Sequence, residues 1–176
     1  MSAFEPGTLI DGYRLETAAY RGGMATLWRV SRDGIPMPLV MKVPHLSYGE
    51  DAAAIVGFEV EQMIMPLLSG PHVPACLAAG DFAVLSYLVM EHLPAKSLDA
   101  RAKLAPIAPE DVVWLGAKIA IALQDIHRQH VIHFDVKPAN ILLDKNDRPY
   151  LTDFGIALRE SEQRREGDSA GTPAYM

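Results

Sequence analysis

Two short segments in the second half of the chain bring acids, an amide and an ammonium group close together. The first carries Asp135, Lys137 and Asn140, and the second carries Asp153. Carboxylate and amide oxygens are ligands that Mg²⁺ favours, and an ammonium group neutralises phosphate charge. The set therefore suits holding a metal-bound triphosphate beside a hydroxyl group. The simpler alternative for Asp135 and Lys137 is an ion pair on the surface.

The order of these residues follows a known pattern. Residues 133–140 spell His-Phe-Asp-Val-Lys-Pro-Ala-Asn, and residues 153–155 spell Asp-Phe-Gly. They resemble the catalytic loop H-R-D-x-K-x-x-N and the metal-binding D-F-G of protein kinases. Lys137 followed by Pro138 is similar to the bacterial-type serine/threonine-specific members. The resemblance implies ATP-dependent phosphoryl transfer to serine or threonine hydroxyls of protein substrates.

This resemblance implies a role for each polar side chain. Asp135 would act as the base that accepts a proton from the substrate hydroxyl, and Lys137 would neutralise the γ-phosphate. Asn140, a member of the same catalytic set, and Asp153 would hold Mg²⁺, so ATP and Mg²⁺ are the implied cofactors. Thr172 matches the family threonine that packs near the base and the lysine.

Two neighbours of the base are expected to have other roles. His133 is interpreted as a structural residue packed against Phe154, in an apolar column that also takes Met65 from the preceding helix. Phe134 departs from the family, which often has arginine at this position. That arginine pairs with a phosphate on the activation loop, and phenylalanine cannot do so.

A lysine within a predicted strand provides a second anchor for the nucleotide. Residues 39–43 are apolar except for Lys42, and they resemble the kinase strand V-A-I-K. The partner of Lys42 is expected on the next helix, where Glu61 is favoured over Glu59 because Phe58 and Glu61 match F-x-x-E together. Pro66 should end that helix near residue 65, which gives a reason to expect a looser Lys42–Glu61 pair.

The glycine-rich loop is the least typical part of the chain. Two predicted strands within residues 13–30 flank it, and the family's glycine positions fall on Tyr20, Gly22 and Ala25. Only the middle glycine is kept, which puts nucleotide affinity in doubt. The resemblance implies that the gatekeeper is Met90 and that the hinge contacts come from Glu91 and Leu93. The full set of implied nucleotide contacts is Lys42, Glu61, Gly22, Gly23, Leu27, Val40, Met90, Glu91, Leu93 and Leu142.

The remaining pattern predicts an α+β, protein-kinase-like fold with two lobes. Residues 1–92 would form an antiparallel β N-lobe with one helix, and residues 93–176 an incomplete, mostly helical C-lobe. Other expected elements are two short strands within 81–90, a short helix starting at Ser97, a helix over 109–129 and a hairpin of 141–143 with 150–152. The apolar face of the long helix is expected at Val112, Leu115, Ile119, Leu123 and Ile126. Because the family's later helices are missing, we expect exposed apolar surface on this helix.

Composition supports an ordinary soluble globular protein. The 176 residues are 49% hydrophobic and 22% charged, and the net charge of −6 gives no electrostatic reason to expect binding to nucleic acid. Cys76 is the single cysteine, so no internal disulfide can form, and a reducing compartment, the cytoplasm, is expected. We find no secretory signal, and no apolar run approaches the roughly 20 residues that span a bilayer.

Two other functions remain open from the sequence. One is a pseudokinase or nucleotide-binding regulatory module with little catalysis, favoured by the missing helices and by Tyr20, Ala25, Val40 and Pro66. The other is a small-molecule phosphotransferase of the antibiotic-kinase kind, which shares H-x-D-x-x-x-x-N. Lys137, Phe154 and the Gly-Thr-Pro-Ala-Tyr ending argue against this second alternative.

The replacement at Phe134 leads to a prediction about regulation. Phosphomimetic substitution of Ser161, Ser169 or Thr172 should not raise turnover through this position, because phenylalanine offers no charge to pair with a phosphate. Phosphoryl transfer by each variant is the measurement. A many-fold gain in turnover that Phe134→Ala then abolished would contradict this prediction.

Overall fold

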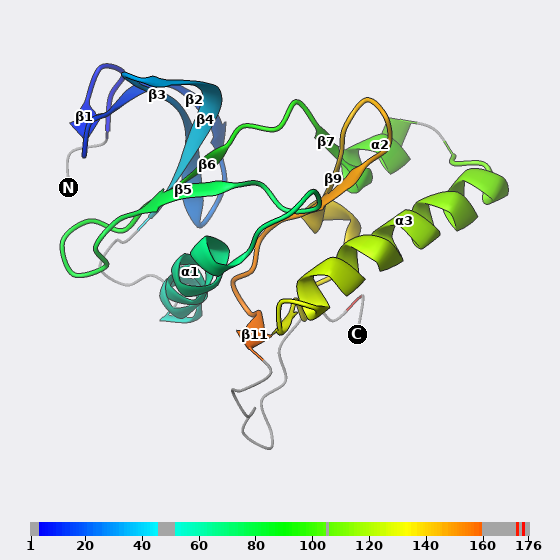
Figure 1. Ribbon diagram of the computed structural model, residues 1–176. Helices are drawn as coiled ribbons and strands as arrows, with labels where there is room; N and C mark the ends of the chain where they lie inside the picture. The colour runs from blue at the N-terminus through cyan, green and yellow to red at the C-terminus, as the bar shows by residue number, and fades with distance from the viewer. Residues whose placement is uncertain (1–3, 46–51, 105, 160–171, 173, 175–176) are drawn as a thin grey trace.

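The computed structural model describes residues 4–45, 52–104, 106–159, 172 and 174. Its first part is a six-stranded antiparallel sheet in the order β1-β2-β3-β4-β6-β5 (Figure 1). The strands are β1 (Leu9–Ile10), β2 (Tyr13–Arg21), β3 (Ala25–Arg32), β4 (Ile35–Pro44), β5 (Cys76–Ala79) and β6 (Leu88–Glu91). The prediction of two strands within residues 13–30 and a strand over 39–43 is confirmed.

The prediction of two strands within residues 81–90 is only half right. Strand β6 lies there, but its partner β5 ends at Ala79, and residues 81–87 form a turn and loop. Asp81 causes this local structure. Its side chain accepts a hydrogen bond from the amide of Ala83 at 2.8 Å, and its carbonyl accepts from Val84 and Leu85. Such side-chain capping competes with strand pairing.

Helix α1 (Ala52–Ile64) follows the sheet's fourth strand and packs below the sheet (Figure 1). At Met65 the α-helix changes to a 3₁₀ turn, η1 (Met65–Leu67), with Pro66 inside it. The predicted end near residue 65 is therefore confirmed. Proline has no amide hydrogen and its ring collides with the carbonyl one turn back, so an α-helical conformation cannot continue through it.

The second part of the structure is built around one long helix. Helix α3 (Pro109–His127) begins after Ala108, whose backbone is extended, and Pro109 takes the first helical position. Ser97 starts the short helix α2 (Leu98–Leu104), as predicted, and its hydroxyl accepts a hydrogen bond from the amide of Ala100 at 3.1 Å. The small elements around them are β7 (Lys96–Ser97), β8 (Val131–Ile132), η2 (Pro138–Asn140), β9 (Ile141–Leu143), β10 (Pro149–Leu151) and β11 (Leu158–Arg159).

The apolar face predicted for α3 needs one correction. Leu115 and Ile126 are buried as expected, but Val112 is 52% exposed, because the first turn of α3 extends past the packed cluster. Ala122, which was not predicted, is fully buried instead. The expected exposed apolar surface on this helix is confirmed by Val113, Trp114 and Ile121, which are all more than half exposed.

The register of the central strands separates two apolar clusters. Met41 on β4 pairs with Trp28 on one side and Val89 on the other, and all three belong to the cluster on the outer face of the sheet. The next row, Leu27, Lys42 and Leu88, faces the opposite way because successive side chains of a strand alternate. This alternation directs Lys42 towards α1.

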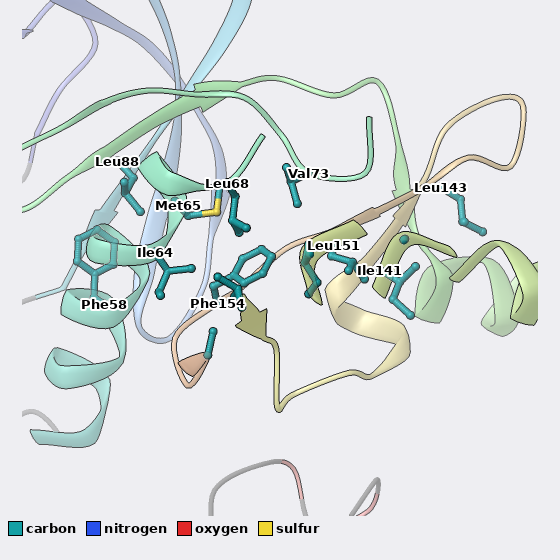
Figure 2. Packing of buried hydrophobic residues seen from close by; sticks show 14 of the residues in the cluster. Phe58, Ile64, Met65, Leu68, Val73, Leu88, Ile141, Leu143, Leu151 and Phe154 are labelled. Carbon is teal, nitrogen blue, oxygen red and sulfur yellow. The ribbon is translucent and has the colours of Figure 1, made fainter. Parts of the chain in front are cut away.

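The second cluster joins α1 to the elements that follow α3. Figure 2 shows Phe154 between the α1 and η1 side chains Ile64 and Met65 and the strand side chains Ile141 and Leu151. All of these residues are at most 3% exposed. Within the described residues, no helix combines the length and apolar character needed to cross a membrane.

Gln62 ties α1 to the sheet and gives a stability prediction. Its buried amide nitrogen donates to the carbonyls of Gly80 at 3.1 Å and Tyr87 at 3.0 Å. Gln62→Ala should lower the free energy of unfolding by about 1–3 kcal/mol, because it leaves buried carbonyls without this donor. Met63→Ala, next to it but 60% exposed, should change the free energy by less than about 0.5 kcal/mol. Urea denaturation measures both, and equal losses would show that the Gln62 contacts contribute nothing.

Candidate active site

Lys42 forms a buried ion pair with helix α1. Its Nζ lies 2.5 Å from Oε2 of Glu61 and 3.5 Å from Oδ1 of Asp153. The predicted partner Glu61 is thus confirmed, while Glu59 is exposed. The expected loosening of the pair by Pro66 is wrong, because α1 stays α-helical to Ile64, beyond Glu61.

Burial and charge act against each other in this pair. Burial opposes the charge of Lys42, but the carboxylates of Glu61 and Asp153 outweigh it and raise the lysine's pKa. Burial also raises the pKa of Glu61, and Lys42 offsets that only in part. We infer an ionised pair, since Lys42 faces two carboxylates at once. Each partner therefore depends on the other to remain buried and charged.

The carboxylate of Asp135 sits at the centre of a hydrogen-bond network. Lys137 Nζ donates to its Oδ2 at 2.7 Å, and Thr172 Oγ1 donates to its Oδ1 at 2.6 Å. Asn140 Nδ2 donates to its Oδ2 and to its backbone carbonyl, both at 3.0 Å. Burial acts to raise the pKa of Asp135, but these hydrogen bonds outweigh burial and hold it below the ordinary value. The carboxylate is therefore ionised at neutral pH.

His133 fixes the backbone of Asp135. It is 1% exposed, and its ring centroid lies 4.6 Å from that of Phe154, which confirms the predicted structural packing. Nε2 is 3.0 Å from the carbonyl of Thr152, so Nε2 carries the proton, and Nδ1 accepts from the amide of Asp135 at 3.3 Å. Burial lowers the pKa of His133, which keeps the ring neutral and able to accept this bond.

Two residues beside these side chains have unusual backbone geometry. Phe134 has a φ of 61° and Asp153 a φ of 66°, in the left-handed region that side chains other than glycine rarely adopt. Such conformations persist only where the surrounding structure enforces them, and they concentrate at functional sites. Here they direct Asp135 and Asp153 towards the same cavity.

A cavity of about 250 Å³ lies between the sheet, α1 and the loops after α3. Five of the predicted site residues line it, namely Lys42, Glu61, Asp135, Lys137 and Asp153. The rest of its wall is Met24 from the β2–β3 turn, Ala25 at the start of β3, Ala53, Ala54, Gly57 and Phe58 from α1, and Gly155 and Ile156.

The other predicted nucleotide contacts lie outside that cavity lining. Strand register puts Leu27, Val40 and Met90 on the same sheet face as Lys42. The remaining residues are Gly22 and Gly23 in the β2–β3 turn, Glu91 and Leu93 at the end of β6, and Leu142 on β9. Their contacts with a nucleotide stay predictions.

The oxygen atoms near Asp153 fit a hard metal ion. Both hydrogen bonds of Asn140 use its Nδ2, so its Oδ1 points away from Asp135. An amide oxygen and a half-exposed carboxylate are ligands that Mg²⁺ accepts, and the ion keeps further positions for water or phosphate.

His45 holds the tip of the glycine-rich turn, and no sequence motif identifies it. Its Nδ1 lies 3.0 Å from the carbonyl of Gly23, and its Nε2 lies 2.8 Å from Oγ1 of Thr26. Its amide also donates to the carbonyl of Met24 at 2.8 Å. These contacts restrain a turn in which only one family glycine is kept.

The sequence model of the protein kinase domain matches residues 37–176. The chain belongs to the protein kinase domain family. It is 30% identical over 173 residues to serine/threonine-protein kinase PknH of Mycobacterium bovis, covering 97% of this chain and 29% of PknH. It is 34% identical over 158 residues to serine/threonine-protein kinase AfsK of Streptomyces griseus, covering 88% of this chain and 19% of AfsK.

A solved kinase domain, that of Mycobacterium tuberculosis PknI, superimposes with a TM-score of 0.72 at 25% identity. The match covers 88% of this chain and 64% of the PknI domain. The predicted two-lobe kinase-like fold is thereby confirmed. The chain spans less than a third of the curated relatives named above and about two thirds of this kinase domain.

Removing the ammonium from the ion pair tests its energetics. Lys42→Met should lower the free energy of unfolding by roughly 3 kcal/mol, because it leaves the Glu61 carboxylate buried without its partner. The same substitution at Lys103, whose pair with Asp99 is exposed, should cost less than about 1 kcal/mol. Lys42→Met combined with Glu61→Leu should regain much of the loss. Denaturant unfolding measures all three variants.

The same variant has a predicted pH dependence. Without Lys42, the pKa of Glu61 in the folded state rises further above its unfolded value, so the folded state binds more protons. Stability of Lys42→Met should therefore increase from about pH 8 towards about pH 5 more steeply than that of the wild type. Parallel profiles for the two proteins would mean that Glu61 is not ionised in the native pair.

Proposed function

We propose that this chain carries the catalytic centre of a serine/threonine protein kinase, which transfers the γ-phosphoryl group of ATP to hydroxyl groups of protein substrates. The observation that supports this most is the convergence of Lys42, Asp135, Lys137 and Asp153 on one cavity. The family match and the names of the relatives agree with this activity.

Asp135 is proposed as the base for the transfer. The substrate oxygen forms a bond to the γ-phosphorus, the bond from that phosphorus to the bridging oxygen breaks, and ADP leaves. The hydroxyl proton passes to the Asp135 carboxylate, which Lys137, Thr172 and Asn140 hold in place. Thr172 already donates to Asp135 at 2.6 Å, the type of hydrogen bond that a substrate hydroxyl would make.

Charge neutralisation is proposed to come from two lysines and a metal ion. Lys137 would face the γ-phosphate, and Lys42, oriented by Glu61, would bind the other phosphates. Asn140 and Asp153 would hold Mg²⁺, which supplies positive charge to the phosphate oxygens when bound. ATP and Mg²⁺ are the cofactors that the family uses in general.

The pseudokinase alternative is not favoured. Its support from the residues is the departures at Tyr20, Ala25, Val40 and Pro66. The polar groups expected of an active kinase are nevertheless present, and Lys42 is paired with Glu61. The small-molecule phosphotransferase alternative loses support because the family and the relatives named above are protein kinases.

Further assignments extend this proposal. The division into an N-lobe over residues 1–92 and a C-lobe over residues 93–176 fits the two apolar clusters only in part, since Phe58, Met65 and Leu88 pack with the second part. A cytoplasmic location and protein substrates without nucleic acid partners are proposed as well.

Replacement of the proposed base gives the direct test. Asp135→Asn should lower phosphoryl transfer from ATP to a generic protein substrate by at least about 100-fold, because the amide cannot accept the proton. Asp33→Asn, an exposed carboxylate in the β3–β4 turn, should leave the rate unchanged. Radiolabelled ATP with phosphoamino acid analysis measures transfer and identifies the acceptor residue. Magnesium-dependent nucleotide binding without transfer by the wild type would instead identify a pseudokinase.

A further inference from the structure

Helix α1 contains a glycine where helices ordinarily avoid one. Gly57 lies in the middle of Ala52–Ile64, and glycine is among the least favourable residues for a helix interior. It precedes Glu61 by one turn, so the two residues share a helix face. A glycine on the face that presents the ion-pairing carboxylate calls for a packing reason.

The backbone of α1 touches the Asp-Phe-Gly segment at this glycine. A Cβ atom on Gly57 would lie 3.3 Å from the carbonyl oxygen of Gly155. A Cβ atom on Gly155 would lie 3.2 Å from the carbonyl oxygen of Gly57. Both distances are tighter than ordinary van der Waals contact, and the opposing atoms belong to the backbone, which cannot rotate away as a side chain can.

Each residue of the Asp153–Gly155 segment is linked to α1 in its own way, either directly or through Lys42. Asp153 faces Lys42, which Glu61 of the helix holds at 2.5 Å. Phe154 packs in the same buried cluster as Phe58 and Met65 (Figure 2). Gly155 touches the helix backbone directly, so it limits how closely the helix approaches.

We propose that Gly57 is a positioning residue that sets the distance between α1 and the Asp153–Gly155 segment through its backbone contact with Gly155. At this distance Glu61 reaches Lys42, and Lys42 reaches Asp153. A methyl group at position 57 displaces the helix or the segment by a few tenths of an ångström. An effect of this displacement on catalysis rests on the proposed kinase function, whereas the displacement itself does not.

Gly57→Ala tests this proposal, with Gly116→Ala as its matched control. Gly116 lies inside α3, and a Cβ atom there would have nothing within 4 Å. Alanine favours the helical conformation more than glycine does, so neither substitution should destabilise the helix that carries it. Only Gly57→Ala should lower kcat/KM for ATP, by about tenfold, because it misplaces charged groups that bind phosphate. It should also speed amide hydrogen exchange in residues 153–157, measured without nucleotide.

The outcomes separate the two proposals. Unchanged kcat/KM and unchanged exchange in Gly57→Ala, as in Gly116→Ala, would overturn the positioning role. A wild type that transfers no phosphate would count against the proposed function, and faster exchange in Gly57→Ala would still support the contact. Gly155→Ala fills the same contact from the other side, so it should accelerate exchange in the same segment. If Gly57→Ala does not fold, hydrogen exchange in Gly155→Ala tests the positioning role in its place.

Discussion

The arrangement of this structure depends on one buried ion pair, between Lys42 and Glu61. A strand supplies the ammonium and a helix supplies the carboxylate, so the pair links β4 to α1. Removing two charges from water costs free energy, and the close approach of the two charged groups offsets that cost. The strand faces its lysine inwards, and the helix is held by Gln62 on one side and by apolar contacts with Phe154 on the other.

The loop that carries Asp135 is organised differently, because neutral groups bind its aspartate alongside Lys137. The ring of His133 connects Thr152 to the amide of Asp135, and the amide of Asn140 binds the same aspartate twice. Asp135 is therefore held at its backbone by His133 and Asn140 and at its carboxylate by Asn140, Lys137 and Thr172. Asp153 links the ion pair to the loop, because it faces Lys42 and directly precedes the phenylalanine that stacks on His133.

The sequence predicted the parts of this structure that motifs and single residues determine. Lys42 with Glu61, the end of α1 at Pro66, and the packing of His133 on Phe154 all follow from local residue types and the family resemblance. Contacts that depend on distant segments were not predicted. His45 lies just outside the motif residues of the strand that it follows, and the pairing of β3 with β4 brings it to Gly23. The strand predicted at Asp81 is a turn, because apolar periodicity does not reveal a turn capped by a side chain. The burial predicted for Val112 is wrong because periodicity does not show where along a helix the packed cluster ends.

The alternation along β4 has a consequence for how this gene can vary. Met41 belongs to the outer cluster and Lys42 to the face that lines the cavity, although they are neighbours in the chain. Losing or gaining one codon within this strand would exchange their directions, placing an ammonium among Trp28, Val30 and Val89 and a thioether beside Glu61. Such a frame-preserving change would damage both the packed core and the ion pair with Glu61. The strand therefore has a fixed length as well as a fixed composition, because each side chain keeps its face only while its place in the register is kept.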